Sequence, residues 1–373
     1  MDKMYVEDCC EILDSMRVPI TSSDREEGKY PYYGANGIQD YIADYIFDDE
    51  LVLLAEDGGN FGSKERPIAY RVSGKCWVNN HAHVLKPKEG LNVDYLCYSL
   101  MFYKVDGMIN GATRQKLTQS AMRKMQIPIR SIEEQKYIVD ELNRIIKIKE
   151  QREKEKKLLD QLIKARFVEM FGNPVLNDKD WVQKSLGEIT TKIGSGATPK
   201  GGKEAYQEEG ITLIRSMNVH NGQFEYKDLA YISDEQASKL DNVTIEEKDV
   251  LLNITGASVA RSCVVPNEIL PARVNQHVCI IRCKDCIIPE FLNKLLIDDN
   301  YQDLLWSVAG SGATREAITK QQVENLQIIL PTIGLQKEYV AFVEQVTKSK
   351  VAVQKALDET QILFDSLMQK YFG

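Results

Sequence analysis

The chain has 373 residues, of which 43% are hydrophobic, and a formal net charge of −8 at pH 7. This length allows two globular domains, each long enough to bury its own core. No apolar run is long enough to span a membrane, and the first residues do not resemble a signal peptide. Eight scattered cysteines do not form the pattern of a disulfide scaffold, so we expect a protein of the reducing cytoplasm.

The charge is distributed unevenly along the chain. Residues 111–166 contain 15 Lys and Arg against 8 Asp and Glu, so the remainder is strongly acidic. A local basic patch of this kind can hold DNA through its phosphates although the whole protein is acidic. A solvated charged helix explains the same composition equally well. Charge alone therefore leaves both interpretations open.

In chain order, the first part alternates apolar strands with polar, glycine-bearing loops, which is typical of an α+β domain. Asn36-Gly37 is a strong turn signal between two of these strands. We place this domain at residues 1–130. Two buried strands and one helix are expected within it, at residues 50–55, 78–85 and 91–103.

A long helix is predicted for residues 131–172. Ser131 and Glu134 have the spacing of a capping box. Gly172 can end the helix in the left-handed conformation, and Pro174 prevents its continuation. Apolar residues recur at helical spacing along it, and those expected to pack are Ile138, Leu142, Ile145, Leu159, Leu162 and Phe167.

The second part of the chain follows the same plan. Residues 173–180 form a linker to a second α+β domain at 181–330, and a second long helix is predicted at 331–373. Its apolar residues repeat every seven positions, as in the seam of a coiled coil. The expected packing residues are Val343, Val346, Val353, Leu357, Phe364 and Leu367. In the second domain, strands are expected at 249–254 and 274–282, and a helix at 289–306.

The two parts are copies of each other. Gly-Ala-Thr-Arg at 111–114 returns at 312–315, and this offset of 201 residues holds to the ends of both helices. Upstream the offset drifts, because Val-Asn-Asn-His at 78–81 and Val-Asn-Gln-His at 274–277 are 196 residues apart. A fixed offset in the helices and a drifting one before them indicates a constant frame that carries two variable modules. We expect the copied helices to pack on each other; two ordinary surface helices are the alternative.

Two segments superficially resemble enzyme motifs. Residues 196–203 are similar to a phosphate-binding loop, but an extra glycine intervenes, and Glu204 stands where Ser or Thr must bind magnesium. Asn173-Pro174 lacks the second proline and the aromatic residue of an amino-methyltransferase motif. We therefore expect neither catalysis nor a cofactor bound by this chain.

Cysteine and histidine residues offer one further candidate site. Cys279, Cys283 and Cys286 lie near His277, but no second pair of ligands follows at zinc spacing, so buried thiols explain them better. His81 and His277 recur in register without a repeated carboxylate or nucleophile beside them. For both we expect hydrogen bonding or packing, and no metal site is predicted.

The duplicated order of these features resembles the specificity subunit of type I restriction–modification enzymes. The resemblance covers essentially the whole chain and rests on residues 31–38, 248–256 and 274–277, and on the two Gly-Ala-Thr-Arg segments with the Ile-Pro or Leu-Pro, the Gln and the long helix that follow each. It departs from the family at the start, where almost nothing precedes Tyr5. It implies an α+β fold of two target recognition domains separated by two long helices, packed as an antiparallel coiled coil with a pseudo-twofold internal repeat.

The resemblance also implies a function. Each recognition domain would read one half of a bipartite, asymmetric target in double-stranded DNA, as part of a defence against foreign DNA. The helices would set the spacing and dock two adenine-N6 methyltransferase subunits, which carry the S-adenosylmethionine, and two motor-nuclease subunits would join for restriction. The chain itself would catalyse nothing. A stand-alone DNA-binding protein, a coiled-coil scaffold and, least supported, a free-standing enzyme remain as alternatives.

Residue types on the loops suggest which positions meet DNA. Asn, Gln and Arg side chains read base edges, whereas Lys, Arg, Ser and Thr contact phosphates. Tyr32 and Tyr33 also fit core positions of a strand, and the copied Arg114 and Arg315 also fit a role in pinning domain to helix. The candidates are Tyr32, Tyr33, Asn36, Asn60 and Arg114 in the first domain, and Ser195, Thr198, Lys200, Arg215, Asn218, Arg261 and Arg315 in the second.

Overall fold

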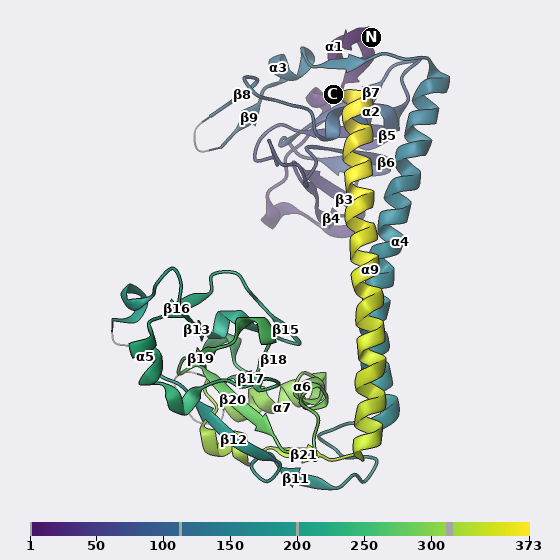
Figure 1. The fold of residues 1–373 in the computed structure, drawn as a ribbon. Helices are drawn as coiled ribbons and strands as arrows, with labels where there is room; N and C mark the ends of the chain where they lie inside the picture. The colour runs from purple at the N-terminus through teal and green to yellow at the C-terminus, as the bar shows by residue number, and fades with distance from the viewer. Residues whose placement is uncertain (1, 112–113, 199–200, 311–315) are drawn as a thin grey trace. The chain divides into compact units, whose positions relative to one another are not determined.

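The computed structural model describes residues 2–111, 114–198, 201–310 and 316–373 (Figure 1). The chain forms two compact units: unit 1 comprises Met1–Lys154 and Gln354–Gly373, and unit 2 comprises Glu155–Val353. Both units share the two long helices, because α4 (Ile132–Phe171) and α9 (Ile333–Phe372) each run from one unit into the other. Each unit combines strands with helices, as expected of an α+β fold.

Unit 1 is built on a six-stranded sheet with the strand order β2-β7-β5-β6-β3-β4. Neighbouring strands are antiparallel except β3 and β6, which are parallel. The strands are β2 (Cys10–Ile12), β3 (Glu27–Gly34), β4 (Gly37–Ile42), β5 (Phe47–Ala55), β6 (Ala69–Val78) and β7 (Ala82–Pro87). Around the sheet lie β1 (Lys3–Tyr5), α1 (Val6–Cys9), α2 (Val93–Met101), β8 (Ile109–Asn110), β9 (Lys116–Leu117), α3 (Gln119–Arg123) and β10 (Gln126–Pro128).

The larger sheets of unit 2 are four-stranded, β12-β20-β17-β18, and three-stranded, β16-β13-β19, while β11 pairs with β21 and β14 with β15. Its strands are β11 (Gln183–Ser185), β12 (Thr190–Ser195), β13 (Ile211–Ile214), β14 (Val219–His220), β15 (Gln223–Phe224), β16 (Ala230–Ile232), β17 (Val250–Asn253), β18 (Ser262–Val264), β19 (Ala272–Val274), β20 (Val278–Cys283) and β21 (Gln327–Ile329). Its shorter helices are α5 (Asp234–Ser238), α6 (Pro289–Leu296), α7 (Asp299–Gly310) and α8 (Lys320–Glu324). The single helix expected at 289–306 is thus wrong, because the chain breaks into α6 and α7.

The repeated Val-Asn-X-His segments are turns and not strand interiors. In unit 1 the strand expected at 78–85 is interrupted, because the Asn79 side chain accepts a hydrogen bond from the backbone N–H of His81 at 2.8 Å. Asn275 does the same for His277 at 3.0 Å, between β19 and β20. Asparagine favours such turns because its short side chain can replace a backbone acceptor. Each turn places a histidine in the loop that follows.

Each long helix is fixed at its start by a glutamine, and the two glutamines occupy equivalent positions of the repeat. The Gln135 side chain accepts from the Asn92 backbone N–H at 2.8 Å and donates to the carbonyls of Gly90 and Arg130. Gln336 accepts from the Ile288 backbone N–H at 2.9 Å and donates to the Cys286 and Pro331 carbonyls. Both side chains are fully buried. Gln135 joins α4 to the loop before α2, and Gln336 joins α9 to the loop before α6.

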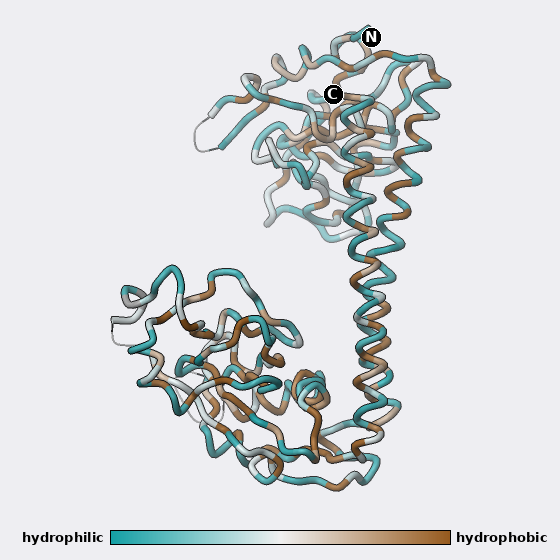
Figure 2. The backbone as a smooth tube through the Cα atoms, viewed as in Figure 1, coloured by the Kyte–Doolittle hydropathy of each residue, from teal (hydrophilic) through white to brown (hydrophobic). Residues whose placement is uncertain are grey.

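In unit 1 the first half of α4 packs against the last part of α9. Ser131 and Glu134 form the expected capping box at the start of α4, with bonds of 3.1 and 3.2 Å, and Gly172 has the expected positive φ after its end. Apolar residues from both helices close the core of the unit (Figure 2). These residues are Ile138, Val139, Leu142, Ile145, Phe364 and Tyr371.

In unit 2 an aromatic cluster joins the second half of α4 to the first half of α9. Phe167 and Phe171 contact the ring of Tyr339 with ring centroids 5.5 and 5.4 Å apart. Among the residues expected to pack, Ile138, Leu142, Ile145, Phe167, Val343, Val346 and Phe364 are buried, and Leu159, Val353, Leu357 and Leu367 are half-buried.

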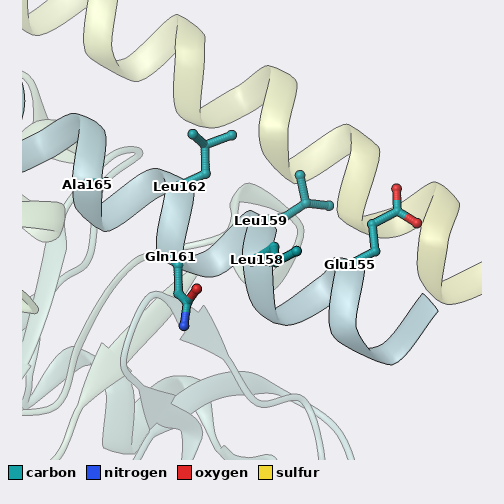
Figure 3. A pocket seen from close by; sticks show the side chains of 6 residues that line it. All are labelled: Glu155, Leu158, Leu159, Gln161, Leu162 and Ala165. Carbon is teal, nitrogen blue, oxygen red and sulfur yellow. The ribbon is translucent and has the colours of Figure 1, made fainter. Parts of the chain in front are cut away.

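The expected packing of Leu162 in α4 is wrong, because its side chain is 46% exposed. Residues 159, 163 and 167 follow each other at four-residue spacing along the inner face, and Leu162 lies one position off that line. It lies instead in an outer apolar stripe with Leu158 and Ala165, which lines an open pocket (Figure 3). Within the described residues, no helix combines the length and hydropathy needed to cross a membrane.

Candidate nucleic-acid interface

Three loops of unit 1 meet around Asp57. Its Oδ1 atom lies 2.7 Å from Arg114 Nη2 and 2.6 Å from His81 Nδ1. Asp57 follows β5, His81 precedes β7, and Arg114 lies between β8 and β9. The Arg114 side chain is 60% exposed, whereas that of Asp57 is 16% exposed. A fixed acidic side chain thus holds an accessible guanidinium at the surface.

The β3–β4 turn joins the same cluster. Asn36 is exposed in this turn, and its amide donates to the Gly58 carbonyl at 2.9 Å. Gly58 has a φ of +63°, and a Cβ atom at this position would lie 3.3 Å from the Arg114 guanidinium. The backbone of Gly58 therefore offers a surface on which the Arg114 guanidinium lies. Two of the residues predicted to meet DNA, Asn36 and Arg114, are brought together here.

The other candidates in unit 1 lie apart from this cluster. Tyr32 is 1% exposed, and its hydroxyl exchanges hydrogen bonds with the backbone of Ile20, so its assignment as a DNA contact is wrong. It is a core residue of β3. Tyr33 is half-buried, with its ring 5.8 Å from that of Tyr70. Asn60 is half-exposed in the loop that follows Gly58.

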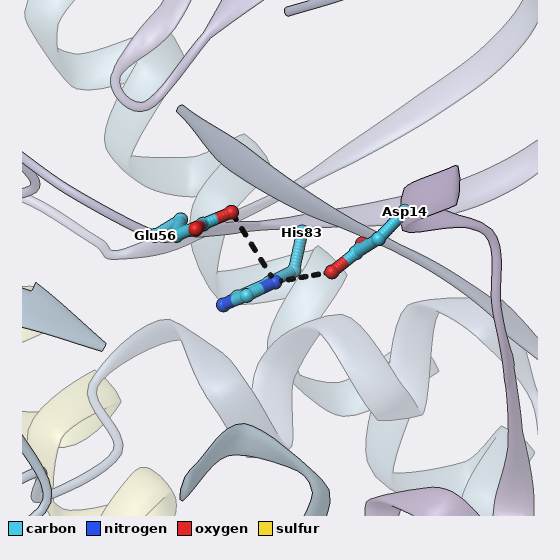
Figure 4. A group of neighbouring side chains, drawn as sticks. All are labelled: Asp14, Glu56 and His83. Carbon is cyan, nitrogen blue, oxygen red and sulfur yellow. Dashed lines mark hydrogen bonds and ion pairs between the residues drawn. The ribbon is translucent and has the colours of Figure 1, made fainter. Parts of the chain in front are cut away.

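Beneath the loops lies a buried ionic cluster (Figure 4). His83 Nδ1 is 2.6 Å from Asp14 Oδ2, and its Nε2 is 2.9 Å from the Leu117 carbonyl. Glu56 meets Arg17 at 2.6 Å and Lys116 at 3.0 Å. Glu56 immediately precedes Asp57, and Lys116 follows the loop that carries Arg114. The cluster therefore anchors both sides of the exposed site.

Electrostatics explains why this buried cluster is stable. Burial alone would raise the pKa of Asp14, but hydrogen bonds from His83 and Gln119 and the charge of His83 lower it overall. Burial also opposes ionisation of Glu56, and bonds from Arg17 and Lys116 again lower its pKa overall. The Leu117 carbonyl can only accept, so His83 Nε2 carries a hydrogen, and Nδ1 faces the carboxylates of Asp14 and Glu56.

Unit 2 builds the corresponding site from neutral side chains. Thr255 Oγ1 lies 2.5 Å from His277 Nδ1, and Gln276 Nε2 lies 3.3 Å from His277 Nε2. The Gln276 carbonyl oxygen accepts from the Thr198 backbone N–H at 2.8 Å and from its hydroxyl. Because the amide of Gln276 donates to Nε2, His277 donates from Nδ1 to Thr255. The two histidines thus act in hydrogen bonding, as expected.

Backbone bonds show that the two sites occupy the same place in each unit. Glu56 and Ile254 donate to the carbonyls of His81 and His277 at 2.8 and 3.0 Å. Leu117 and Ile318 donate to the carbonyls of Glu56 and Ile254 at 2.7 and 2.8 Å. Asp57 and Thr255 each form an isolated bridge, to Lys116 and to Ala317 respectively. The backbone is repeated while the side chains differ.

The remaining candidates of unit 2 have diverse surroundings. Asn218 is fully buried, and its side chain bonds the backbone of residues 215, 225 and 227, so its assignment as a DNA contact is wrong. Arg215 is half-buried; it donates to the Asp228 carbonyl and lies 5.5 Å over the Tyr206 ring. Ser195 is exposed at the end of β12, and Arg261 is half-buried before β18. Lys200 and Arg315 lie outside the described residues.

Part of the basic segment is used inside the protein. In unit 1, Arg152 donates to the Ala356 carbonyl and the Thr360 hydroxyl of α9, and Lys149 donates to Gln361. In unit 2, Arg166 meets Glu338 at 2.9 Å, and Lys164 meets Asp299 at 2.7 Å. These cations hold α4 to its neighbours. The basic composition of the segment is therefore partly explained by helix packing.

The cysteines of unit 2 are thiols of the interior or its margin. Cys279 is buried, and Cys283 and Cys286 are half-buried. Burial raises the pKa of the Cys279 and Cys283 thiols to about 12, so both are protonated at neutral pH. A zinc ligand must be a thiolate, which burial of this kind disfavours. This environment fits the expected assignment as buried thiols.

A model of the type I restriction modification DNA specificity domain matches residues 1–159 and matches again at residues 178–360. The chain belongs to this family. The protein S.HindORF215P of Haemophilus influenzae, named as a type I specificity subunit, is 39% identical over 36% of this chain and 34% of its own length. The chain thus spans about a third of that relative. The MjaIX specificity subunit of Methanocaldococcus jannaschii is 24% identical over 87% of this chain and 77% of its own length.

Solved structures of this type I family share the fold. The S subunit of a type I restriction–modification system from M. genitalium has a TM-score of 0.59 at 14% identity, and covers 100% of this chain and 96% of the other. A structure from work on complex assembly and conformational transition of the type I system has a TM-score of 0.61 at 17% identity, with the same coverage. The specificity-subunit fold therefore extends over the whole chain.

Proposed function

We propose that, as the specificity subunit of a type I restriction–modification system, this chain reads a bipartite, asymmetric target in double-stranded DNA, one half with each unit. The observation that carries this proposal is the duplicated loop site. The backbone around Asp57 and Thr255 is bonded in the same way, but the exposed side chains differ. Two equal frames with unequal polar surfaces suit two different half-sites, because base identity is read by side chains.

The recognition domains are proposed to comprise residues 1–130 and 181–330, with 173–180 as the linker between the first helix and the second domain. DNA contacts are assigned to the exposed or half-exposed loop residues. These are Asn36, Asn60 and Arg114 in unit 1, and Ser195, Thr198, Arg215 and Arg261 in unit 2. The half-buried Tyr33, near the end of β3, also keeps its proposed role. Lys200 and Arg315 keep their proposed role on sequence grounds alone. The chain itself catalyses nothing in this proposal.

The helices α4 and α9 are proposed to form an antiparallel coiled coil that relates the recognition domains by a pseudo-twofold repeat. Each helix has 40 residues, which corresponds to about 60 Å at roughly 1.5 Å per residue. This length matches at most about 17 base pairs at roughly 3.4 Å each, so half-sites about one turn of DNA apart fit comfortably. The helices would thus set the gap between the half-sites.

Two methyltransferase subunits are proposed to dock on the repeated helices and to methylate adenine N6. They would carry the S-adenosylmethionine, and two motor-nuclease subunits would join them for restriction. The support lies in the exposed apolar residues of the helices. Leu162 and its repeat partner Leu363 are 46% and 50% exposed, and an apolar residue exposed in both copies suits two copies of one partner.

The test is to co-express the full chain with the methyltransferase subunit of the same restriction–modification system and to map methylated adenines by long-read sequencing. A split motif with one methylated adenine in each half is expected. The methyltransferase expressed without the chain is the control, and it should leave no such motif. Methylation without a split motif, or a motif independent of the chain, would contradict the proposal.

A second test addresses the helices as a spacer. Four residues are inserted after Lys154 in α4 and four after Val353 in α9, where the two units divide. Each insertion adds one turn, about 6 Å. The gap in the target should lengthen by a base pair or two while both half-sites keep their sequence. A changed half-site sequence would show that the recognition domains are wrongly assigned.

A further inference from the structure

We propose that Arg114 reads a guanine in the half-site of unit 1, and that Asp57 and Gly58 act as positioning residues that hold its guanidinium in the plane needed for this contact. The inference rests on the proposed function and adds a base identity to it. In this inference Arg114 contacts a base and not a phosphate.

The first support is the way in which Asp57 holds Arg114. One carboxylate oxygen accepts from Arg114 at 2.7 Å and lies 2.6 Å from His81 Nδ1, so side chains from two other loops converge on it. Asp57 is itself fixed, because its backbone bridges Lys116 and its side chain is largely covered. The guanidinium therefore does not sample the surface freely although it is exposed to solvent.

Gly58 supplies the second constraint. A Cβ atom here would lie 3.3 Å from both Nε and Nη2 of Arg114, closer than most side-chain contacts, and the φ of +63° disfavours any other residue. Its carbonyl accepts from Asn36, and its backbone N–H donates to the Gln115 carbonyl at 3.3 Å. Loops from three parts of the sequence thus fix the surface on which the guanidinium lies.

The charge balance distinguishes base reading from phosphate binding. A phosphate is attracted by net positive charge, and the carboxylate 2.7 Å from the guanidinium reduces that attraction. The same carboxylate improves base reading, because it fixes the orientation of a planar donor group. Arginine has five N–H donors and Asp57 engages Nη2, so donors remain for a second partner. Guanine presents two acceptors, O6 and N7, on its major-groove edge, which is the pattern that arginine fits with two bonds.

The corresponding position of unit 2 has no such arrangement. Thr255 replaces Asp57 and meets His277, whose ring nitrogens are both engaged by neutral partners. Among the described residues, a carboxylate at this position of the repeat is therefore present in unit 1 alone. Arg315, the repeat partner of Arg114, lies outside the described residues. We expect its effect on sequence preference to be confined to one half of the target.

The experiment uses the full chain in complex with its methyltransferase, once the split motif has been mapped. Methylation rates are measured on duplexes in which each base pair of the motif is replaced in turn, for the wild type and for Arg114→Ala and Asp57→Asn. Both variants should relax the requirement for one and the same G·C pair, by about tenfold or more. Asp57→Asn should also strengthen binding to unrelated DNA at low salt, because it frees the charge of Arg114.

Two control variants accompany this measurement. Asp106→Asn removes one exposed negative charge from the same unit and should leave the base preferences unchanged. Arg261→Ala in unit 2 should leave the G·C preference of the Arg114 half intact. Thermal unfolding of each variant checks folding, and Asp57→Glu, which keeps the charge, should restore part of the discrimination if Asp57 acts by positioning.

Several outcomes would overturn the inference. A uniform loss of affinity on all duplexes for Arg114→Ala, with a smaller salt dependence, would identify a phosphate contact. Relaxed preference in both halves for Asp57→Asn would indicate a merely structural role. A split motif without a G·C pair in the affected half would also contradict it. Absence of any split motif would instead refute the proposed function, so the two failures are distinguishable.

Discussion

The two units share a backbone arrangement around the loop site, but the residues buried beneath it differ between them. In unit 1, Glu56 and His83 lie beneath the exposed loops as part of a buried ionic cluster. In unit 2, the strand pairing places Ile254 and Cys279 at the matching positions, and both are buried. Above them, unit 1 carries the charged Asp57 and Arg114, whereas unit 2 carries the neutral Thr255 and Gln276. The same backbone arrangement thus accepts side chains of different charge and polarity.

In unit 1, therefore, the charged side chains at the surface lie above buried charged side chains. An exposed Asp–Arg pair gains little stability from its own contact. In unit 1 the loops on both sides of that pair are instead fixed from below, by Glu56 on one side and Lys116 on the other. Unit 2 fixes its loops with apolar residues and neutral hydrogen bonds. The predictions that follow test this contrast.

The largest effect is expected from transferring one apolar residue of unit 2 into unit 1. Glu56→Ile removes the carboxylate that Arg17 and Lys116 contact most closely, which should lower the free energy of unfolding by about 3 kcal/mol. Calorimetry gives the stability, and hydrogen exchange in β5 and β7 localises the loss to unit 1. A loss confined to unit 2, or one below about 1 kcal/mol, would mean that the buried cluster does not fix these loops.

A smaller loss of stability, equal in the two units, is expected when the glutamine at the start of each long helix is removed. Gln135→Ala and Gln336→Ala each leave one backbone N–H and two carbonyls without their partner. Each should lower the free energy of unfolding by about 2 kcal/mol. Denaturant unfolding of both variants checks this prediction. Clearly unequal losses would show that the repeat is less strict at the helix starts than the hydrogen bonds indicate.

Acid should reveal the ionic cluster of unit 1. The pKa values of Asp14 and Glu56 are lowered in the folded state, below the ordinary values of about 3.9 and 4.3. Their contribution to stability is therefore present above about pH 4 and is lost as the pH falls through the lower folded pKa values. Thermal unfolding between pH 2 and 6 should show this loss, and Asp14→Asn should flatten it. An unchanged pH profile in the variant would argue against the assignment.

The smallest effect on stability is expected on the outer face of α4. Leu162→Ser should change the free energy of unfolding by less than about 0.5 kcal/mol, because the side chain is exposed. Phe167→Ala, on the inner face, should cost about 3 kcal/mol and serves as the matched comparison. Co-purification then tests docking: Leu162→Ser should weaken retention of the methyltransferase. Full retention would place the docking surface elsewhere.

Much of the frame could be predicted from the sequence, because periodicity and end signals act locally. The capping box at Ser131, the glycine after α4 and the buried strands β5 and β17 follow directly from residue patterns. The break between α6 and α7 was missed, because helical spacing continues across it. Leu162 was misplaced because it has helical spacing from Leu159, although the packed line of the helix runs through residues 159, 163 and 167.

The site was harder to predict, because it depends on contacts between distant residues. Asn36 and Arg114 were found by residue type, but Asp57 and Gly58, which hold them, have no local signal of that role. Tyr32 and Asn218 suit DNA contacts by chemistry and are excluded only by burial. The repeated Val-Asn-X-His was a usable signal. Asparagine two residues before a copied histidine indicates a turn that presents the ring.

The division of α9 between the units has a consequence for synthesis of the protein. Unit 1 contains the first 154 residues and also the last twenty, Gln354–Gly373, which supply Phe364 and Tyr371 to its core. As the chain leaves the ribosome, unit 1 cannot close until these residues emerge, although unit 2 is by then fully translated. Any chain that terminates early therefore exposes the apolar side of unit 1.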